Sequence, residues 1–125
     1  MTDFLDIGLR IFQAFVAVFF LMAGAMHAFH YEAAKKSLPW VKDVPRGVVM
    51  LDGAAEILGA IGVILPRLTN ILPVLTPLAA AGLAPIMAVG MALHARRKEY
   101  SAIGFTGLLF LMAAFVGYGR WFLVP

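Results

Sequence analysis

The chain has 125 residues, of which 62% are hydrophobic and only 14% charged. A soluble domain is about 45–50% apolar and about 25% charged, so this composition excludes a soluble globular fold as well as disordered, collagen-like and coiled-coil chains. The absence of cysteine excludes disulfides, thiol chemistry and cysteine-bound metal or iron–sulfur centres. The net charge of +3 is explained by short basic loops at a membrane surface, and we expect no nucleic-acid partner.

Four apolar stretches are long enough to cross a bilayer, because a hydrocarbon core about 30 Å thick needs roughly 20 apolar helical residues. Together they take up most of the chain and leave no room for a soluble domain. The sequence therefore predicts one all-α domain over residues 1–125, an integral membrane bundle of four transmembrane helices in contact with the lipid bilayer. The predicted helices cover residues 7–29, 47–65, 71–94 and 101–123.

Residues 7–29 are nearly unbroken, with Arg10, Gln13 and His27 as the polar exceptions. The stretch is too long for the apolar region of a signal peptide, and acidic rather than basic residues precede it. We therefore expect it to remain in the membrane. The connection over residues 30–46 carries three lysines, a tyrosine and a tryptophan, which is typical of a segment at the membrane interface.

Residues 47–65 contain two acids, Asp52 and Glu56. They are four residues apart and therefore share a helix face, and Glu56 lies about 14 Å along the helix at about 1.5 Å per residue, near the middle of the membrane. Intramembrane acids are costly and usually functional, and two neighbouring carboxylates should not both be ionised in a low dielectric. The alternative is structural, with each acid hydrogen-bonding a neighbouring helix.

Residues 71–94 carry Met87, Met91 and His94 at helical spacing after Pro85. Proline removes a backbone hydrogen bond, so we expect a kink about one turn before it. Methionine-lined faces suit adaptable apolar pockets, although the same pattern also fills ordinary helix cores. For each histidine of the chain, the alternative to a site role is an interfacial or capping role.

The basic residues predict how the chain is oriented. With four spans, the first and third connections lie on one side of the membrane and hold seven basic residues, against three on the opposite side. The positive-inside rule then places these two connections in the cytoplasm and both termini outside, in the cell inner membrane. The seven are Lys35, Lys36, Lys42, Arg46, Arg96, Arg97 and Lys98, and the three are Arg10, Arg67 and Arg120.

This topology also brings the acids and two histidines into one half of the membrane. Such side chains could in principle form a carboxylate–histidine metal centre or a bis-histidine haem site. However, the Glu-x-x-His repeat of di-iron bundles and the other marks of a haem pocket are missing, so we expect no metal. The candidates for a catalytic role are Asp52, Glu56 and His94. The residues expected to bind a ligand are Glu56, Asp52, His27, His94, Met87 and Met91.

The segment EILGAIGVILP at residues 56–66, followed by LAAAGL at 78–83 and by Met87 and His94, resembles the DoxX-like family of small bacterial membrane proteins. AGAMH at residues 23–27 fits as well, and the resemblance covers essentially the whole chain. It implies a four-helix membrane bundle, with Glu56 as the characteristic intramembrane acid and Met87 and His94 as a third-helix motif. The family takes its name from a subunit of a thiosulfate:quinone oxidoreductase, but a likeness of fold does not transfer a reaction.

Three functions remain open at this point, and the sequence does not decide whether the protein is an enzyme. The first is binding of a quinone or another lipid-like small molecule in an intramembrane pocket near Glu56. The protein would then act as a membrane redox accessory, and its cofactor would be a quinone. The second is a non-enzymatic accessory subunit or assembly factor, within a homo-oligomer or a larger membrane complex. The third is a membrane isomerase or hydrolase with Asp52 and Glu56 as acid and base.

Overall fold

The computed structural model describes residues 2–125, and in this part of the chain every regular element is helical. Four helices are long and apolar enough to cross a membrane, which confirms the predicted all-α membrane bundle. The elements are α1 (Thr2–Phe29), α2 (Tyr31–Ser37), the short turn η1 (Val41–Asp43), α3 (Arg46–Thr69), α4 (Leu75–Arg96), α5 (Tyr100–Tyr118) and the wide last turn η2 (Gly119–Leu123).

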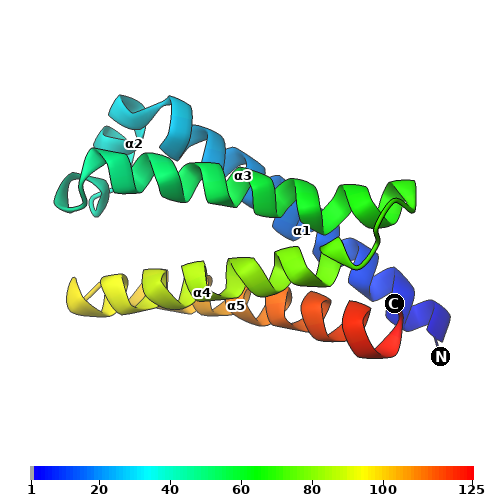
Figure 1. Cartoon of the computed structure of the whole chain (residues 1–125). Coiled ribbons are helices and arrows are strands. Elements are labelled where there is room, and N and C mark those ends of the chain that lie inside the picture. Colours follow the sequence, from blue (N-terminus) through cyan, green and yellow to red (C-terminus); the bar gives the residue numbers. More distant parts are fainter. Residues whose placement is uncertain (1) are drawn as a thin grey trace.

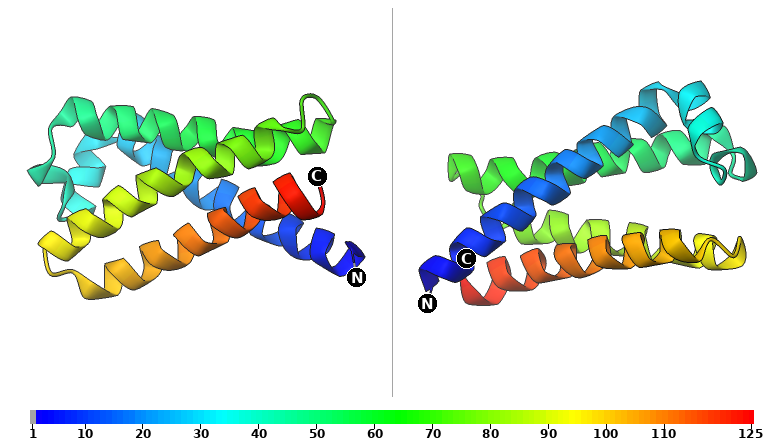
Figure 2. Two further views of the ribbon diagram at one scale, coloured as in Figure 1. Left: turned by 60° about the horizontal axis from the view of Figure 1, so that its bottom comes forward. Right: turned by 180° about the vertical axis from the view of Figure 1, so that it is seen from behind.

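The helices pack as two antiparallel pairs, α1 with α3 and α4 with α5, and α1 crosses the bundle obliquely to reach α5 (Figures 1 and 2). One end of the bundle, here called the loop end, carries residues 30–45 and the turn at 97–99. The other, the terminal end, carries both ends of the described chain and the turn at 70–74 (Figure 1). The first and third connections therefore lie on one side, as the count of four spans predicts.

The turn between α3 and α4 lies further along the chain than the sequence predicts. We expected a break at Pro66, but α3 continues through this buried proline to Thr69, where the threonine hydroxyl donates to the carbonyl of Leu65 at 2.7 Å. A single proline removes one helical hydrogen bond and leaves the rest of the ladder intact. The helix stops at Asn70, whose left-handed conformation (φ 58°) is one that asparagine tolerates.

The main apolar core runs along the centre of the bundle, while many large apolar side chains face outward, as expected where lipid is the solvent. The core is built from all four long helices and includes Val16, Phe20, Val63, Leu83, Met87, Leu109 and Val116. A second, small cluster at the loop end packs Ala34, Val41 and Val49 under Trp40. It holds α2 and η1 over the ends of α1 and α3.

Two glycines set the distance between α1 and α3. A Cβ atom added at Gly24 would lie 2.7 Å from the carbonyl oxygen of Gly53, and one added at Gly53 would lie 2.5 Å from the backbone nitrogen of Ala28. The two backbones are therefore in direct contact, which is how small residues act in membrane helix pairs. Because His27 is one turn from Gly24, and Glu56 one turn from Gly53, this crossing brings their side chains together.

Candidate functional site

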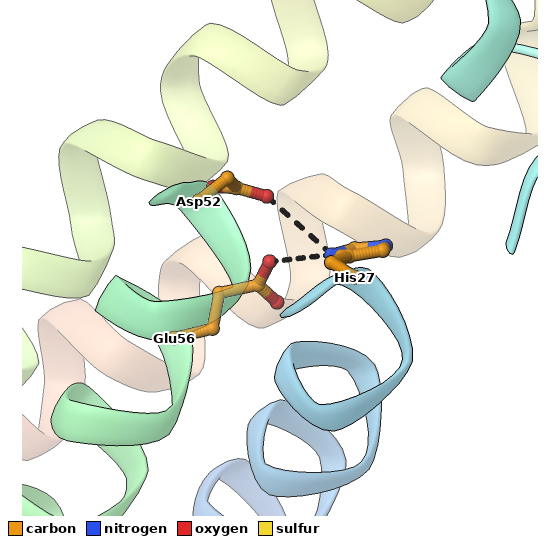
Figure 3. Close-up of side chains that lie close together, drawn as sticks. All are labelled: His27, Asp52 and Glu56. Atoms are coloured by element: carbon orange, nitrogen blue, oxygen red, sulfur yellow. Dashed lines mark hydrogen bonds and ion pairs between the residues drawn. The ribbon is translucent and has the colours of Figure 1, made fainter. Parts of the chain in front are cut away.

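A histidine and two acids meet between α1 and α3 (Figure 3). His27 in the last turn of α1 places its Nδ1 atom 2.8 Å from Oε1 of Glu56 and 3.5 Å from Oδ2 of Asp52. Both acids project from one face of α3, as their spacing of four residues predicts. We call these three residues the His27 cluster.

The cluster is buried on one side and open on the other. His27 and Glu56 are 6% and 3% exposed, whereas the side chain of Asp52 is 29% exposed. Hydrogen bonds between polar groups are strongest where water is excluded, so the contact between His27 and Glu56 is the tighter of the two. Asp52 forms the edge through which the cluster meets its surroundings.

The two ring nitrogens of His27 have different environments. Nδ1 faces carboxylate oxygens and therefore donates its hydrogen to them, because an ionised carboxylate only accepts. Nε2 is also buried, yet it has no hydrogen-bond partner among the described residues. The ring of Trp40 packs edge-on against the imidazole, with centroids 5.2 Å apart and planes at 78°. The imidazole is thus held in one orientation, and its Nε2 atom is free to bind a further group.

The same three residues form a group that could hold a metal ion. One ligand atom from each of His27, Asp52 and Glu56 lies within 4.8 Å of the others. One imidazole and two carboxylates suit divalent transition metals such as manganese, iron or zinc, and three protein ligands leave positions free for water or substrate. The sequence predicts no metal, because the Glu-x-x-His repeat of di-iron bundles and the marks of a haem pocket are missing. The short distances between these three side chains are a reason to test that prediction.

The other residues predicted for the site lie elsewhere. His94 places Nδ1 2.9 Å from Oε1 of Glu99, in the turn after α4, and this hydrogen bond, aided by Arg97, holds the pKa of the Glu99 carboxyl below its usual range. Met87 is packed in the main core, and Met91 lies against Gly107 of α5. Their role in ligand binding stays a prediction, and only His27, Asp52 and Glu56 form one cluster.

A second polar group, at the terminal end, was missed by the sequence reasoning, which used Arg120 only for topology. Arg120 is 2% exposed and donates to the side chain of Gln13 at 2.8 Å and to the carboxylate of Asp6 at 2.7 Å. Gln13 in turn donates to the carbonyl of Val63 at 2.8 Å. In the sequence, Gln13 and Arg120 are single polar residues within apolar stretches and Asp6 precedes the first stretch. This pattern does not show which of them pair.

Two apolar grooves open on the surface of the bundle, and neither is lined by the His27 cluster or by a methionine. One has a volume of about 420 Å³ and lies between α4 and α5 at the terminal end, where Pro77, Ala113, Tyr118 and Trp121 are among its lining residues. The other has about 390 Å³ and lies between α1 and α3, lined by Ala14, Ala17, Val18, Leu21, Ala60, Ile61, Ile64 and Leu65.

Four apolar helices with an acid–histidine cluster buried between two of them define a small multi-pass membrane protein. The DoxX-like family matches residues 11–116, so the chain belongs to the DoxX-like family. This confirms the resemblance seen in the sequence, and the matched region contains the whole His27 cluster. No curated protein and no solved structure matches the chain.

Proposed function

We propose that the His27 cluster binds the polar end of a quinone or of another lipid-like small molecule, and that the protein serves as a membrane redox accessory. The observation that supports this proposal is the buried Nε2 atom of His27, which has no hydrogen-bond partner within residues 2–125. Buried polar atoms nearly always have a hydrogen-bond partner. A polar atom left over in a ring that two carboxylates hold in place is therefore a ready point of attachment for a ligand.

The chemistry of the ring fits both forms of a quinone. When the imidazole is protonated, Nε2 donates to a quinone carbonyl; when the ring is neutral and Nδ1 keeps its hydrogen, Nε2 accepts from a quinol hydroxyl. Asp52 and Glu56 lie within reach of the same ring through Nδ1, so protons can pass between three adjacent groups. The chain contains no cysteine, so a partner would exchange the electrons.

The surroundings of Asp52 support entry from the bilayer. Next to this half-exposed acid on α3, Val48 and Leu51 are 53% and 71% exposed, as side chains in contact with lipid are. A ligand with a long apolar tail would keep the tail in the bilayer and bring its polar end in beside Asp52. The half-buried Trp40 would then lie over the bound ring.

The experiment is a thermal-shift titration of the purified protein in detergent with a short-chain ubiquinone, a short-chain menaquinone and their quinols. We expect a rise in Tm for the wild-type protein that is lost in His27→Phe and reduced in Glu56→Gln. His30→Phe, which changes an exposed neighbouring histidine, should keep the full shift. If none of the four compounds raises the Tm of the wild type, the proposal is wrong.

We also propose that the loop end faces the cytoplasm of a bacterial cell and the terminal end faces outward, in the inner membrane. The seven basic residues of the two connections support this orientation. Because the chain has no cysteine, single cysteines report cleanly on sidedness. A membrane-impermeant maleimide added to intact spheroplasts should label Asn70→Cys and not Ser37→Cys; the reverse pattern would invert the orientation.

A second candidate function, as an accessory subunit or assembly factor, is favoured by two outward-facing glycines. Gly82 on α4 and Gly104 on α5 are exposed, and a Cβ added at either would have no atom of the described chain within 4 Å apart from its own helix backbone. Small residues on a lipid-facing surface allow another helix to approach closely. Affinity purification in a mild detergent should then recover a stoichiometric membrane partner that Gly82→Leu or Gly104→Leu loses. Isolation of the wild type alone would count against this function.

A further inference from the structure

The terminal end of the bundle holds more arginine side chains than acidic ones. Asp6 is the shared partner of three arginines: its carboxylate lies 2.9 Å from Nε of Arg10, 2.7 Å from a terminal nitrogen of Arg120 and 3.5 Å from one of Arg67. Asp3, in the first turn of α1, makes no ion pair in the part of the chain that the structure describes. The three arginines face two aspartates at this end, Asp3 and Asp6, so one positive charge among these side chains is in excess.

Of the three arginines, Arg10 and Arg67 are the two whose side chains reach the surface of the bundle. Arg120 is buried and already satisfied by Asp6, Gln13 and the carbonyl of Val124. The side chains of Arg10 and Arg67 are 66% and 23% exposed. Arg67 also donates to the carbonyl of Pro125, and its buried Nε atom has no hydrogen-bond partner among the residues that the structure describes. The exposed parts of both guanidinium groups, and that of Arg10 above all, are therefore open to an anion.

An apolar groove starts beside these two arginines. It runs between α1 and α3, has a volume of about 390 Å³ and is lined only by apolar residues. Its first residue on α1, Ala14, is four positions after Arg10, and Ile64 on α3 is three positions before Arg67. Residues three or four apart share a helix face. The groove and the two arginines thus form one continuous surface, apolar along its length and cationic at the end.

We propose that this surface binds an anionic phospholipid, with an acyl chain in the groove and the phosphate at Arg10 and Arg67. Guanidinium groups match phosphate oxygens in geometry and charge, and the terminal end is where a lipid headgroup would lie. A second copy of the chain fits less well, because a symmetric contact on this face would bring its own excess arginines against these. This lipid site lies at the opposite end of the bundle from the His27 cluster and shares no residue with it.

The headgroup is tested by native mass spectrometry of the detergent-solubilised full chain with equimolar phosphatidylglycerol and phosphatidylcholine that carry identical acyl chains. We expect phosphatidylglycerol adducts to exceed phosphatidylcholine adducts at least fivefold on the wild type. Arg10→Gln or Arg67→Gln should lower that ratio about fivefold, since each basic residue near the surface contributes that order of attraction. Arg96→Gln, an equal charge change on an exposed residue at the loop end, should leave the ratio unchanged.

The groove is tested separately with Ala14→Phe, which fills it from an exposed position and should remove most of the phosphatidylglycerol adduct. Equal adducts of both lipids on the wild type would overturn the proposal. So would a loss in Arg96→Gln as large as in Arg10→Gln, because net charge alone would then explain binding. An unchanged adduct in Ala14→Phe would contradict the seated acyl chain. If Arg67→Gln fails to fold, Arg10→Gln, which changes an exposed side chain, decides the result.

Discussion

His27 Nδ1 lies 2.8 Å from Glu56 Oε1, although 29 residues separate the two in the chain. The contact exists because α1 and α3 touch backbone to backbone at Gly24 and Gly53, one turn away from these side chains. The two glycines that let α1 and α3 approach closely therefore also allow His27 to reach Glu56.

The two acids should couple to His27 with different strengths. We expect a double-mutant cycle of His27→Leu with Glu56→Met to give a coupling of about 1–3 kcal/mol, because this hydrogen bond is short and buried. The cycle of His27→Leu with Asp52→Leu should give less than about 1 kcal/mol, since Asp52 is more distant and partly exposed. Reversible unfolding in mixed micelles measures both. Equal couplings, or a larger one for Asp52, would contradict the arrangement.

Gly24→Ala should destabilise the protein by about 1–3 kcal/mol, because the added methyl group would meet the α3 backbone, which cannot move aside without separating the helices. Gly82→Ala provides a matched control on α4, where the same methyl group would contact no neighbouring helix of the described chain. Alanine is the better helix former by about 1 kcal/mol, so this variant should be neutral or slightly more stable. A similar loss in both variants would mean that backbone contact at Gly24 is not the cause.

Arg120 should be important for stability although it lies near a helix end. Arg120→Met removes the donor to the Gln13 side chain and leaves a buried amide oxygen without a partner, which costs about 1–3 kcal/mol. Adding Gln13→Leu removes that oxygen and should recover part of the loss. Arg96→Met, at an exposed site, should change the free energy of unfolding by less than about 0.5 kcal/mol. A double variant less stable than Arg120→Met would refute the pairing.

The turn after α4 should show a small dependence of stability on pH. The hydrogen bond from His94 holds the pKa of Glu99 below its usual range in the folded protein. A carboxyl with a lowered folded pKa stabilises the fold above its unfolded value of about 4.3, and this contribution is lost as pH falls through the folded value. The Tm difference between wild type and Glu99→Gln should therefore be positive at pH 7 and shrink towards pH 3.

The control for this pH series is Glu32→Gln, which changes an exposed acid on α2. Its Tm difference from the wild type should stay constant across the same range. A difference for Glu99→Gln that persists unchanged at pH 3 would show that the side chain acts through packing rather than through its charge.

The sequence by itself determined the class of protein, the number of membrane helices and the shared face of Asp52 and Glu56. These follow from quantities local to the chain, namely the length of an apolar run against the bilayer thickness and the helical repeat of 3.6 residues. Helix ends were less well predicted, because a single proline such as Pro66 can be accommodated within a helix whose other hydrogen bonds remain.

Only the tertiary structure decided which side chains meet. The topology brought both His27 and His94 to the same half of the membrane, yet His27 contacts the acids while His94 pairs with Glu99. Likewise Arg120 contacts Gln13, 107 residues away. Such contacts depend on how each helix is rotated about its axis and how closely its backbone approaches its neighbour, and these are set by packing between helices rather than by spacing within one.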